Sequence, residues 1–161
     1  MGTRSTIALE FADGTVQQVY CHWDGYLSNN GKILAEHYSD PFKLRELIDL
    51  GDLSSLRPTI GIQHPFSSFQ LETQAERDAH EKLVENMCTF YGRDRNEKCP
   101  AKKFKDYADY VENHQYEEFE YILRNIDGKA VWFVADHDNV YITLEQAFID
   151  EQDRIAQEET A

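Results

Sequence analysis

Hydrophobic and polar residues alternate at the beginning of the chain. Ile7, Leu9 and Phe11 fall on one side of an extended segment, and polar residues fall on the other. Because successive side chains of a strand point to opposite faces, this alternation predicts a half-buried strand over residues 4–11. Asp13-Gly14 is a tight-turn signal, and a second β-rich run follows. We therefore predict an N-terminal β-hairpin.

Helical spacing replaces this alternation in the next part of the chain. A short helix is predicted over residues 33–38, where apolar and aromatic residues recur at helical intervals. Asp40 and Pro41 then match the N-cap and first position of a second helix, and Gly51 is typical of a helix end. The buried stripe expected on this second helix consists of Leu44, Leu47 and Ile48.

The middle of the chain mixes helix breakers with charged residues. Prolines and a glycine predict an irregular loop over residues 54–70, with one short strand at 59–62. Residues 74–87 and 101–112 have helical periodicity, and a charged loop is expected between them at 92–100. The inner side of the first of these helices would consist of Ala79, Leu83, Val84 and Met87.

The last third of the chain returns to strands and ends in a helix. Residues 117–126 alternate, Asp127-Gly128 is a second turn signal, and residues 130–135 are apolar on both faces. A third short strand is expected at 139–142. Thr143 then matches the N-cap of a final helix, with Gln146 completing a capping box.

This order of elements predicts an α+β fold. The sheet would be mostly antiparallel, formed by the N-terminal hairpin and a C-terminal three-strand meander, with helices packed on one face. The chain of 161 residues is long enough to bury one substantial core, so we expect a single domain over residues 1–161 with a frayed tail at 157–161. No stretch approaches the ~20 apolar residues that a membrane helix requires.

The net charge of the chain says more about its function than the rest of its composition does. Thirty acidic residues face sixteen basic ones, which gives a formal net charge of −14. Six of the basic residues fall within 93–105. A field of one sign disfavours nucleic acid and anionic membranes as ligands and favours basic protein surfaces. We therefore expect a protein partner, and neither direct nucleic-acid binding nor membrane binding.

The acidic residues gather in two late segments. Such runs are usually solvated surface that keeps a protein soluble. Carboxylates spaced along helices can also imitate the phosphates of duplex DNA, which carries one charge per ~1.7 Å of axis. The candidate partner-binding residues are Asp106, Asp109, Glu112, Glu117 and Glu118 in the first segment, and Glu145, Asp150, Glu151 and Asp153 in the second.

Two basic residues form the sharpest candidate for a small-ligand site. The guanidinium forks of Arg93 and Arg95 match phosphate or carboxylate groups, and Tyr91 adds an aromatic ring nearby. In the alternative interpretation, both arginines pair with the surplus carboxylates of the protein itself.

The block from Val19 to Tyr26 contains Cys21, His22 and Asp24, which suggests a nucleophile with its base or a metal site. Adjacent strand residues point to opposite faces, so Cys21 and His22 do not converge on one atom. In the alternative interpretation, Cys21 and Trp23 pack in the core and Asp24 begins a turn.

Metal and cofactor chemistry receive little further support from the sequence. The three cysteines match no zinc pattern and fit a reduced setting. The run Asp136–Asn139 offers oxygen ligands for a cation but lacks the ligand spacing of a calcium loop. We predict no metal, no cofactor and no catalytic residues.

Several motifs together carry a resemblance. They are the start Met1–Arg4, the block Val19–Tyr26 with Gly31–Leu34 and His37-Tyr38 behind it, and Tyr91–Arg95. In these residues the chain resembles a family of small uncharacterised proteins of tailed bacteriophages and prophages. The similarity covers most of the chain apart from residues 54–70. It implies an accessory gene product that acts in the cytoplasm of an infected bacterium, where small acidic phage proteins often block restriction or CRISPR components.

Three function hypotheses follow. In the first, the protein binds and inhibits a basic host defence or nucleic-acid-binding protein, with DNA mimicry as one mechanism. In the second, it binds a nucleotide or small anion at Arg93 and Arg95, as a sponge for a defence signal. In the third, it is a small hydrolase or metal-dependent enzyme that uses His22 and Asp24.

Overall fold

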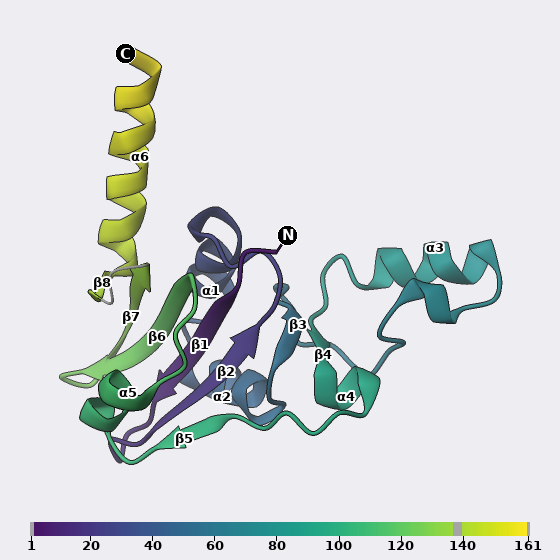
Figure 1. Ribbon diagram of the computed structural model, residues 1–161, viewed down its shortest axis with the longest axis horizontal. Helices are drawn as coiled ribbons and strands as arrows, with labels where there is room; N and C mark the ends of the chain where they lie inside the picture. Colours follow the sequence, from purple (N-terminus) through teal and green to yellow (C-terminus); the bar gives the residue numbers. More distant parts are fainter. Residues whose placement is uncertain (1, 137–139, 161) are drawn as a thin grey trace.

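The computed structural model describes residues 2–136 and 140–160 (Figure 1). Over these residues the chain forms an α+β fold with six α-helices and a mixed eight-stranded sheet. The strands are β1 (Ser5–Glu10), β2 (Val16–Cys21), β3 (Leu53–Ser55), β4 (Thr89–Phe90), β5 (Lys102–Phe104), β6 (Phe119–Ile126), β7 (Lys129–Asp136) and β8 (Ile142–Thr143). The helices are α1 (Lys32–His37), α2 (Pro41–Asp49), α3 (Gln74–Leu83), α4 (Tyr91–Arg95), α5 (Tyr107–Asn113) and α6 (Leu144–Thr160), with a π-helical turn η1 (Leu27–Gly31) and a 3-10 turn η2 (Ser68–Gln70).

The sheet contains the predicted hairpin and the predicted meander. β1 and β2 pair antiparallel, and β6, β7 and β8 follow one another in antiparallel order. The strand order is β4-β3-β2-β1-β6-β7-β8, and β5 pairs with β2 beside this path. Two pairings are parallel, β1 with β6 and β2 with β3, and the sequence patterns did not predict them. They make β1 a central strand that joins the hairpin to the meander.

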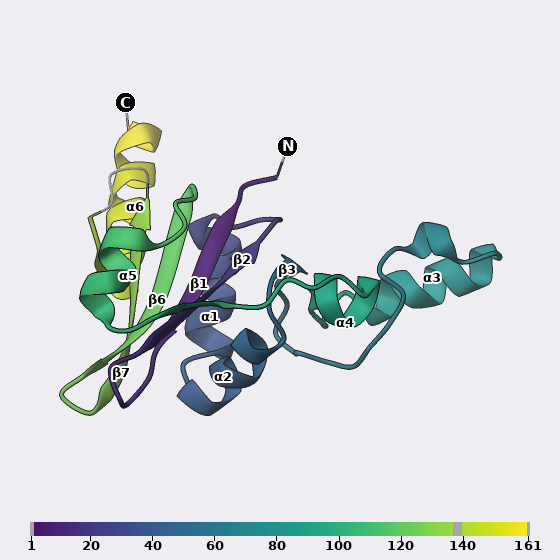
Figure 2. The same ribbon diagram turned by 60° about the horizontal axis from the view of Figure 1, so that its bottom comes forward.

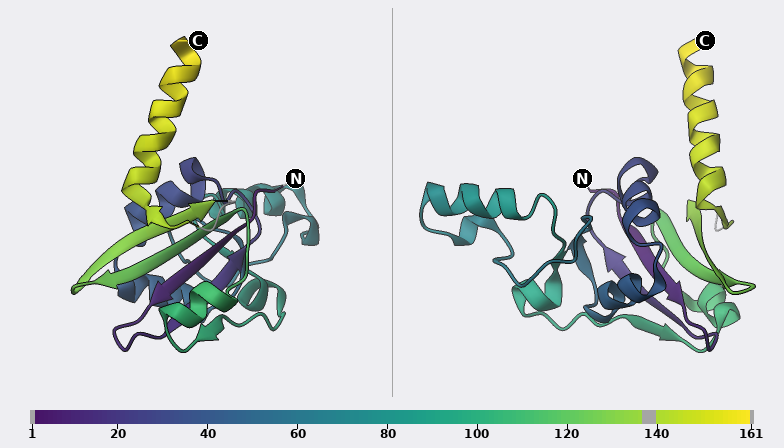
Figure 3. Two further views of the ribbon diagram at one scale, coloured as in Figure 1. Left: turned by 60° about the vertical axis from the view of Figure 1, so that its left-hand side comes forward. Right: turned by 180° about the vertical axis from the view of Figure 1, so that it is seen from behind.

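Helices cover both faces of the sheet, which corrects the expectation of helices on one face. Ile7 and Leu9 pack with α1 and α2 on one side, whereas Ala8 and Ile122 pack with Tyr110 of α5 on the other. Figure 3 shows α1 and α2 on one side of the strands and α5 on the other. β1 is therefore buried on both faces and is not the half-buried strand that its alternation predicted.

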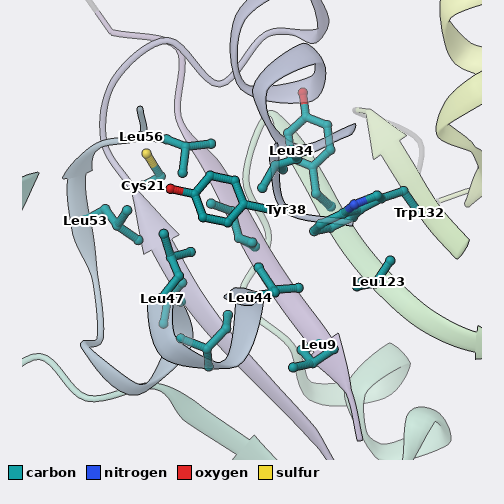
Figure 4. Close-up of a cluster of buried hydrophobic side chains, with 14 of the residues drawn as sticks. Leu9, Cys21, Leu34, Tyr38, Leu44, Leu47, Leu53, Leu56, Leu123 and Trp132 are labelled. Carbon is teal, nitrogen blue, oxygen red and sulfur yellow. The ribbon is translucent and has the colours of Figure 1, made fainter. Parts of the chain in front are cut away.

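The larger core lies between the sheet and the first two helices. Leu44, Leu47 and Ile48 are fully buried there, as the α2 stripe predicted, and Asp40 accepts a hydrogen bond from the Phe42 amide at the N-cap. Figure 4 shows these leucines grouped around Tyr38 with side chains from β1, β2 and β3. Replacing one of them with alanine would cost about 2–5 kcal/mol of stability, so this core contributes strongly to the stability of the fold.

The block from Val19 to Tyr26 forms the end of β2 and the turn after it. Tyr121 of β6 donates a hydrogen bond of 2.6 Å to the carbonyl of Gly25, and the Asn30 side chain donates to the Ser5 hydroxyl at 3.2 Å. Cys21 is buried as expected, but the side chain of Trp23 is 44% exposed and does not pack in the core.

The segment between β4 and β6 differs most from its predicted structure. Residues 92–100 were expected to be a loop, yet α4 begins at Tyr91. Residues 101–112 were expected to be one helix, yet Lys102–Phe104 form β5 and α5 starts only after Asp106. The edge of β2 explains the strand, because residues 16–18 offer backbone groups that β5 pairs with.

Two helices extend away from the body of the fold at opposite ends of the molecule. Figures 1 and 2 show α3 at one end of the long axis, while α6 rises from the other end of the sheet. The α3 stripe was predicted to face inward, but Ala79 and Leu83 are exposed and the buried residue of this helix is His80. Helix α6 continues to Thr160, beyond the point where the tail was expected to fray.

Candidate docking surface around helix α6

Helix α6 is fixed to the sheet at its first turns. The Gln146 amide donates a hydrogen bond of 3.2 Å to the Thr143 hydroxyl, which is the predicted N-cap interaction. Leu144 and Ala147 are buried, and the helix contacts β7, β8 and η1. A helix of 17 residues is ~25 Å long, so most of it stands clear of these contacts, as Figure 1 shows.

The projecting part of α6 is strongly acidic. Helix α6 carries six carboxylates, five of them beyond its first turn, and one cation, Arg154, whose guanidinium donates a hydrogen bond of 3.3 Å to Glu158 one turn further on. Five of the six acidic residues are exposed, and Glu151 is half-buried. The six are Glu145, Asp150, Glu151, Asp153, Glu158 and Glu159. At 1.5 Å of rise per residue, this is about one carboxylate per 4.2 Å of helix axis, a wider spacing than the ~3.4 Å between phosphates along one DNA strand.

A groove of about 380 Å³ lies where α6 leaves the sheet. One wall is a single face of the helix, because Ala147, Asp150, Glu151 and Arg154 recur at intervals of three and four residues. The opposite wall and floor come from η1 and from strands β6 to β8 and their connection. Those lining residues are Leu27, Phe119, Val134, Asp136, Val140 and Ile142. We call this feature the α6 groove.

The other predicted acidic segment uses several of its carboxylates within the fold. Asp106 caps α5 by accepting from the Asp109 amide at 2.8 Å, and Asp109 accepts from the Lys105 amide and the Asn113 side chain. These hydrogen bonds lower the pKa of Asp109. Glu117 accepts from the Gln115 side chain. Glu112 and Glu118 are exposed, and the segment therefore offers a partner fewer uncommitted carboxylates than its composition suggested.

A buried polar network also lies in this segment, and sequence reasoning did not find it. His114 Nε2 and the Tyr141 hydroxyl both lie 2.7 Å from the same oxygen of Glu120, and the Tyr110 hydroxyl lies 3.0 Å from that of Tyr141. Burial of the ring opposes protonation, but the hydrogen bond and negative charge of Glu120 raise the pKa of His114 above its usual value. Neither side chain of the His–Glu pair is accessible, so the network holds α5 on the sheet.

Arg93 directs its guanidinium into the protein. It pairs with the buried Asp94 carboxylate at 3.0 Å and donates to the carbonyl oxygens of Cys88 and Ile60. Asp94 in turn accepts from the amides of His64 and Phe90. Arg93 therefore holds the strands around α4 together and would have to give up these contacts to bind an external anion.

Arg95 and Tyr91 do lie together, as the anion-site hypothesis expected. The Arg95 guanidinium carbon lies 4.9 Å from the centre of the Tyr91 ring and 4.3 Å from that of Phe66. Its NH2 group also donates to Glu97 at 2.9 Å. The basic residue is thus partly neutralised by an acidic neighbour, which is the alternative that the sequence left open.

His22 and Asp24 have different surroundings in the structure. His22 Nδ1 lies 2.7 Å from the Tyr20 hydroxyl, whereas Asp24 lines an open hollow of about 290 Å³ together with Trp23, Arg57 and His80. Of the described residues that line this hollow, none is His22. The enzyme hypothesis for these two residues stays a prediction.

Across residues 2–136 and 140–160, no three His, Cys, Asp or Glu side chains are grouped in a way that could hold a metal ion. The candidate cation run Asp136–Asn139 falls largely outside the described residues. None of the helices in the described part of the chain is long and apolar enough to cross a membrane. Comparison of the chain with protein-family models, with curated proteins and with solved structures found no match.

Proposed function

We propose that this protein is an acidic interaction protein that binds a basic protein surface through helix α6. The observation that carries the proposal is the position of α6, which projects from the fold with six carboxylates and one cation. The buried residues of α6, Leu144 and Ala147, lie in its first turn, and five of its six carboxylates are exposed. A projecting helix with this charge attracts a basic partner over a long range and so accelerates association.

A host nuclease, restriction or CRISPR component, or another nucleic-acid-binding protein, is the class of partner that we propose, in the cytoplasm of an infected bacterium. Such proteins carry basic surfaces for nucleic acid. The exposed carboxylates of α6 support competition with a nucleic-acid strand for such a surface. The carboxylates are distributed around the helix and not along one face, so the support is for charge competition and not for a copy of the duplex groove.

The test compares two variants with the same net charge. The first, which we call the neutral α6 variant because it neutralises four of the six carboxylates of α6, combines Glu145→Gln, Asp150→Asn, Asp153→Asn and Glu159→Gln. The second removes four exposed carboxylates elsewhere by Glu46→Gln, Asp49→Asn, Glu72→Gln and Glu85→Gln. Proteins captured from bacterial lysate by the wild type are purified, and their affinity is measured by calorimetry at several salt concentrations. The α6 variant should bind about tenfold more weakly, since each exposed pair contributes about 0.2–1 kcal/mol, while the control should stay within about twofold.

The dependence of the affinity on salt and the effect of added duplex DNA determine how the result is interpreted. Affinity that falls steeply with salt, together with displacement of the partner by duplex DNA, would support competition for a nucleic-acid site. A partner that is indifferent to salt, or that both variants bind equally well, would contradict the proposal.

A further inference from the structure

The α6 groove differs from the rest of the acidic surface because it combines carboxylates with an apolar floor. Val140 is 60% exposed and Ile142 is 36% exposed beside it, while Val134 and Ala147 are buried beneath. Charged surface alone needs no hollow and no exposed β-branched residues. The proposed role of α6 as a charged helix therefore does not explain why the groove also has exposed apolar side chains.

Carboxylates stand on both sides of this apolar floor. Asp136 ends β7 on one side, and Asp150 and Glu151 lie on the α6 face opposite. The one cation of the groove is Arg154, which is bonded to Glu158 further along the helix. A ligand side chain that enters the groove would thus pass between negative groups before it reaches apolar atoms.

We propose that the α6 groove binds a short basic segment of the partner protein, in which one large apolar side chain is flanked by lysine or arginine. This inference rests on the proposed function, and it adds an apolar contact that would make the binding specific. The apolar side chain would occupy the floor at Val134 and Ile142, and the flanking cations would pair with Asp136 and Asp150. Charge complementarity selects this occupant, and a volume of about 380 Å³ accepts one or two side chains.

A second copy of this chain is a poorer occupant. With a net charge of −14, two copies repel one another, and the groove itself is lined by three carboxylates and one cation. A small polyamine would satisfy the carboxylates but would leave the apolar floor uncovered. Both remain outcomes of the test.

The test uses a labelled model peptide with a Leu-Trp pair flanked on each side by three lysines. A matched peptide replaces Leu-Trp with Ser-Ser and keeps every charge. Affinities are measured by fluorescence anisotropy at physiological salt. The wild type should bind the anchored peptide about tenfold more tightly than the matched one, the factor expected from partial burial of a large apolar side chain.

Two protein variants locate the effect. Val140→Ser with Ile142→Ser removes apolar atoms of the groove without changing charge, and it should reduce the difference between the peptides to less than about twofold. Ile149→Ser is the matched control, because this side chain is 48% exposed on α6 and is not among the residues that line the groove. It should leave the difference unchanged, and thermal unfolding would verify that all three proteins remain folded.

The other outcomes separate the inference from the function on which it rests. If the wild type binds both peptides equally well and the neutral α6 variant binds both more weakly, the groove proposal is wrong and the acidic helix remains the binding element. Peptide binding that is insensitive to neutralisation of α6 would overturn both. Displacement of the anchored peptide by spermidine at similar concentration, or self-association that the groove variant abolishes, would replace the proposed occupant with a polyamine or a second copy.

Discussion

The two acidic segments have similar compositions but opposite uses. In the segment that contains α5, Asp106 and Asp109 accept backbone hydrogen bonds and Glu120 is buried against His114. On α6, the carboxylates face solvent, and the hydrogen bonds of Asp150 and Glu158 are to exposed side chains of the same helix. The difference indicates that the number of carboxylates available to a partner depends on how many the fold leaves uncommitted, and not only on how many a segment contains.

Removal of Glu120 should have the largest effect of any change in either segment. Glu120→Ala leaves His114 and the Tyr141 hydroxyl buried without their shared acceptor. Loss of one partner of a buried pair costs about 3–5 kcal/mol, so we expect a decrease of about 3 kcal/mol in the free energy of unfolding. Urea denaturation measures this value. Glu112→Ala, an exposed carboxylate on α5, is the control and should change stability by less than about 0.5 kcal/mol.

Substitution of Asp106, the N-cap residue of α5, should have a smaller effect on stability. Two variants separate the contribution of its hydrogen bond from that of its charge. Asp106→Ala removes the acceptor of the Asp109 amide and should cost about 1 kcal/mol, whereas Asp106→Asn keeps an N-cap side chain and should cost much less. Thermal or urea unfolding distinguishes the two. If both substitutions were equally harmful, the charge and not the cap would be the important property of Asp106, and the contrast with α6 would weaken.

The His114–Glu120 pair should also make the stability of this region depend on pH. The folded pKa of His114 is raised above the unfolded value of 6.5, so its contribution is fully present below pH 6.5 and is lost as pH rises through the folded pKa. The titratable groups in contact with the ring include Glu120, Tyr110, Tyr116 and Tyr141. Urea unfolding at a series of pH values should therefore show a fall in stability above pH 6.5. The fall should be absent in His114→Gln, and a parallel fall in that variant would assign it to other groups.

The sequence was informative where one local pattern decides the structure. Asp40 with Pro41, the α2 stripe, both turn signals and Thr143 were all predicted, because each depends on neighbours in the chain. The parallel pairing of β1 with β6 and the strand β5 were not, because they depend on which edges meet in the folded protein. For the same reason sequence reasoning located the charge of α6 but not the groove at its base, whose walls come from η1, β6, β7, β8 and α6.

A single exposed carboxylate of α6 should have the smallest effect on stability and the opposite sign. Asp153 lies three residues from Asp150, and like charges at that spacing destabilise a helix by about 0.2–0.5 kcal/mol. Asp153→Asn should therefore leave stability unchanged or raise it slightly, because Asn and Asp have similar helix propensities. Amide hydrogen exchange along α6 measures this, since local opening of a projecting helix need not appear in global unfolding. The same substitution should weaken binding of the basic peptide. A carboxylate that lowers the stability of its own helix but strengthens binding of a basic ligand is the behaviour expected of a docking element. A loss of stability in Asp153→Asn would instead indicate that the carboxylates of α6 stabilise the fold, as those of the α5 segment do.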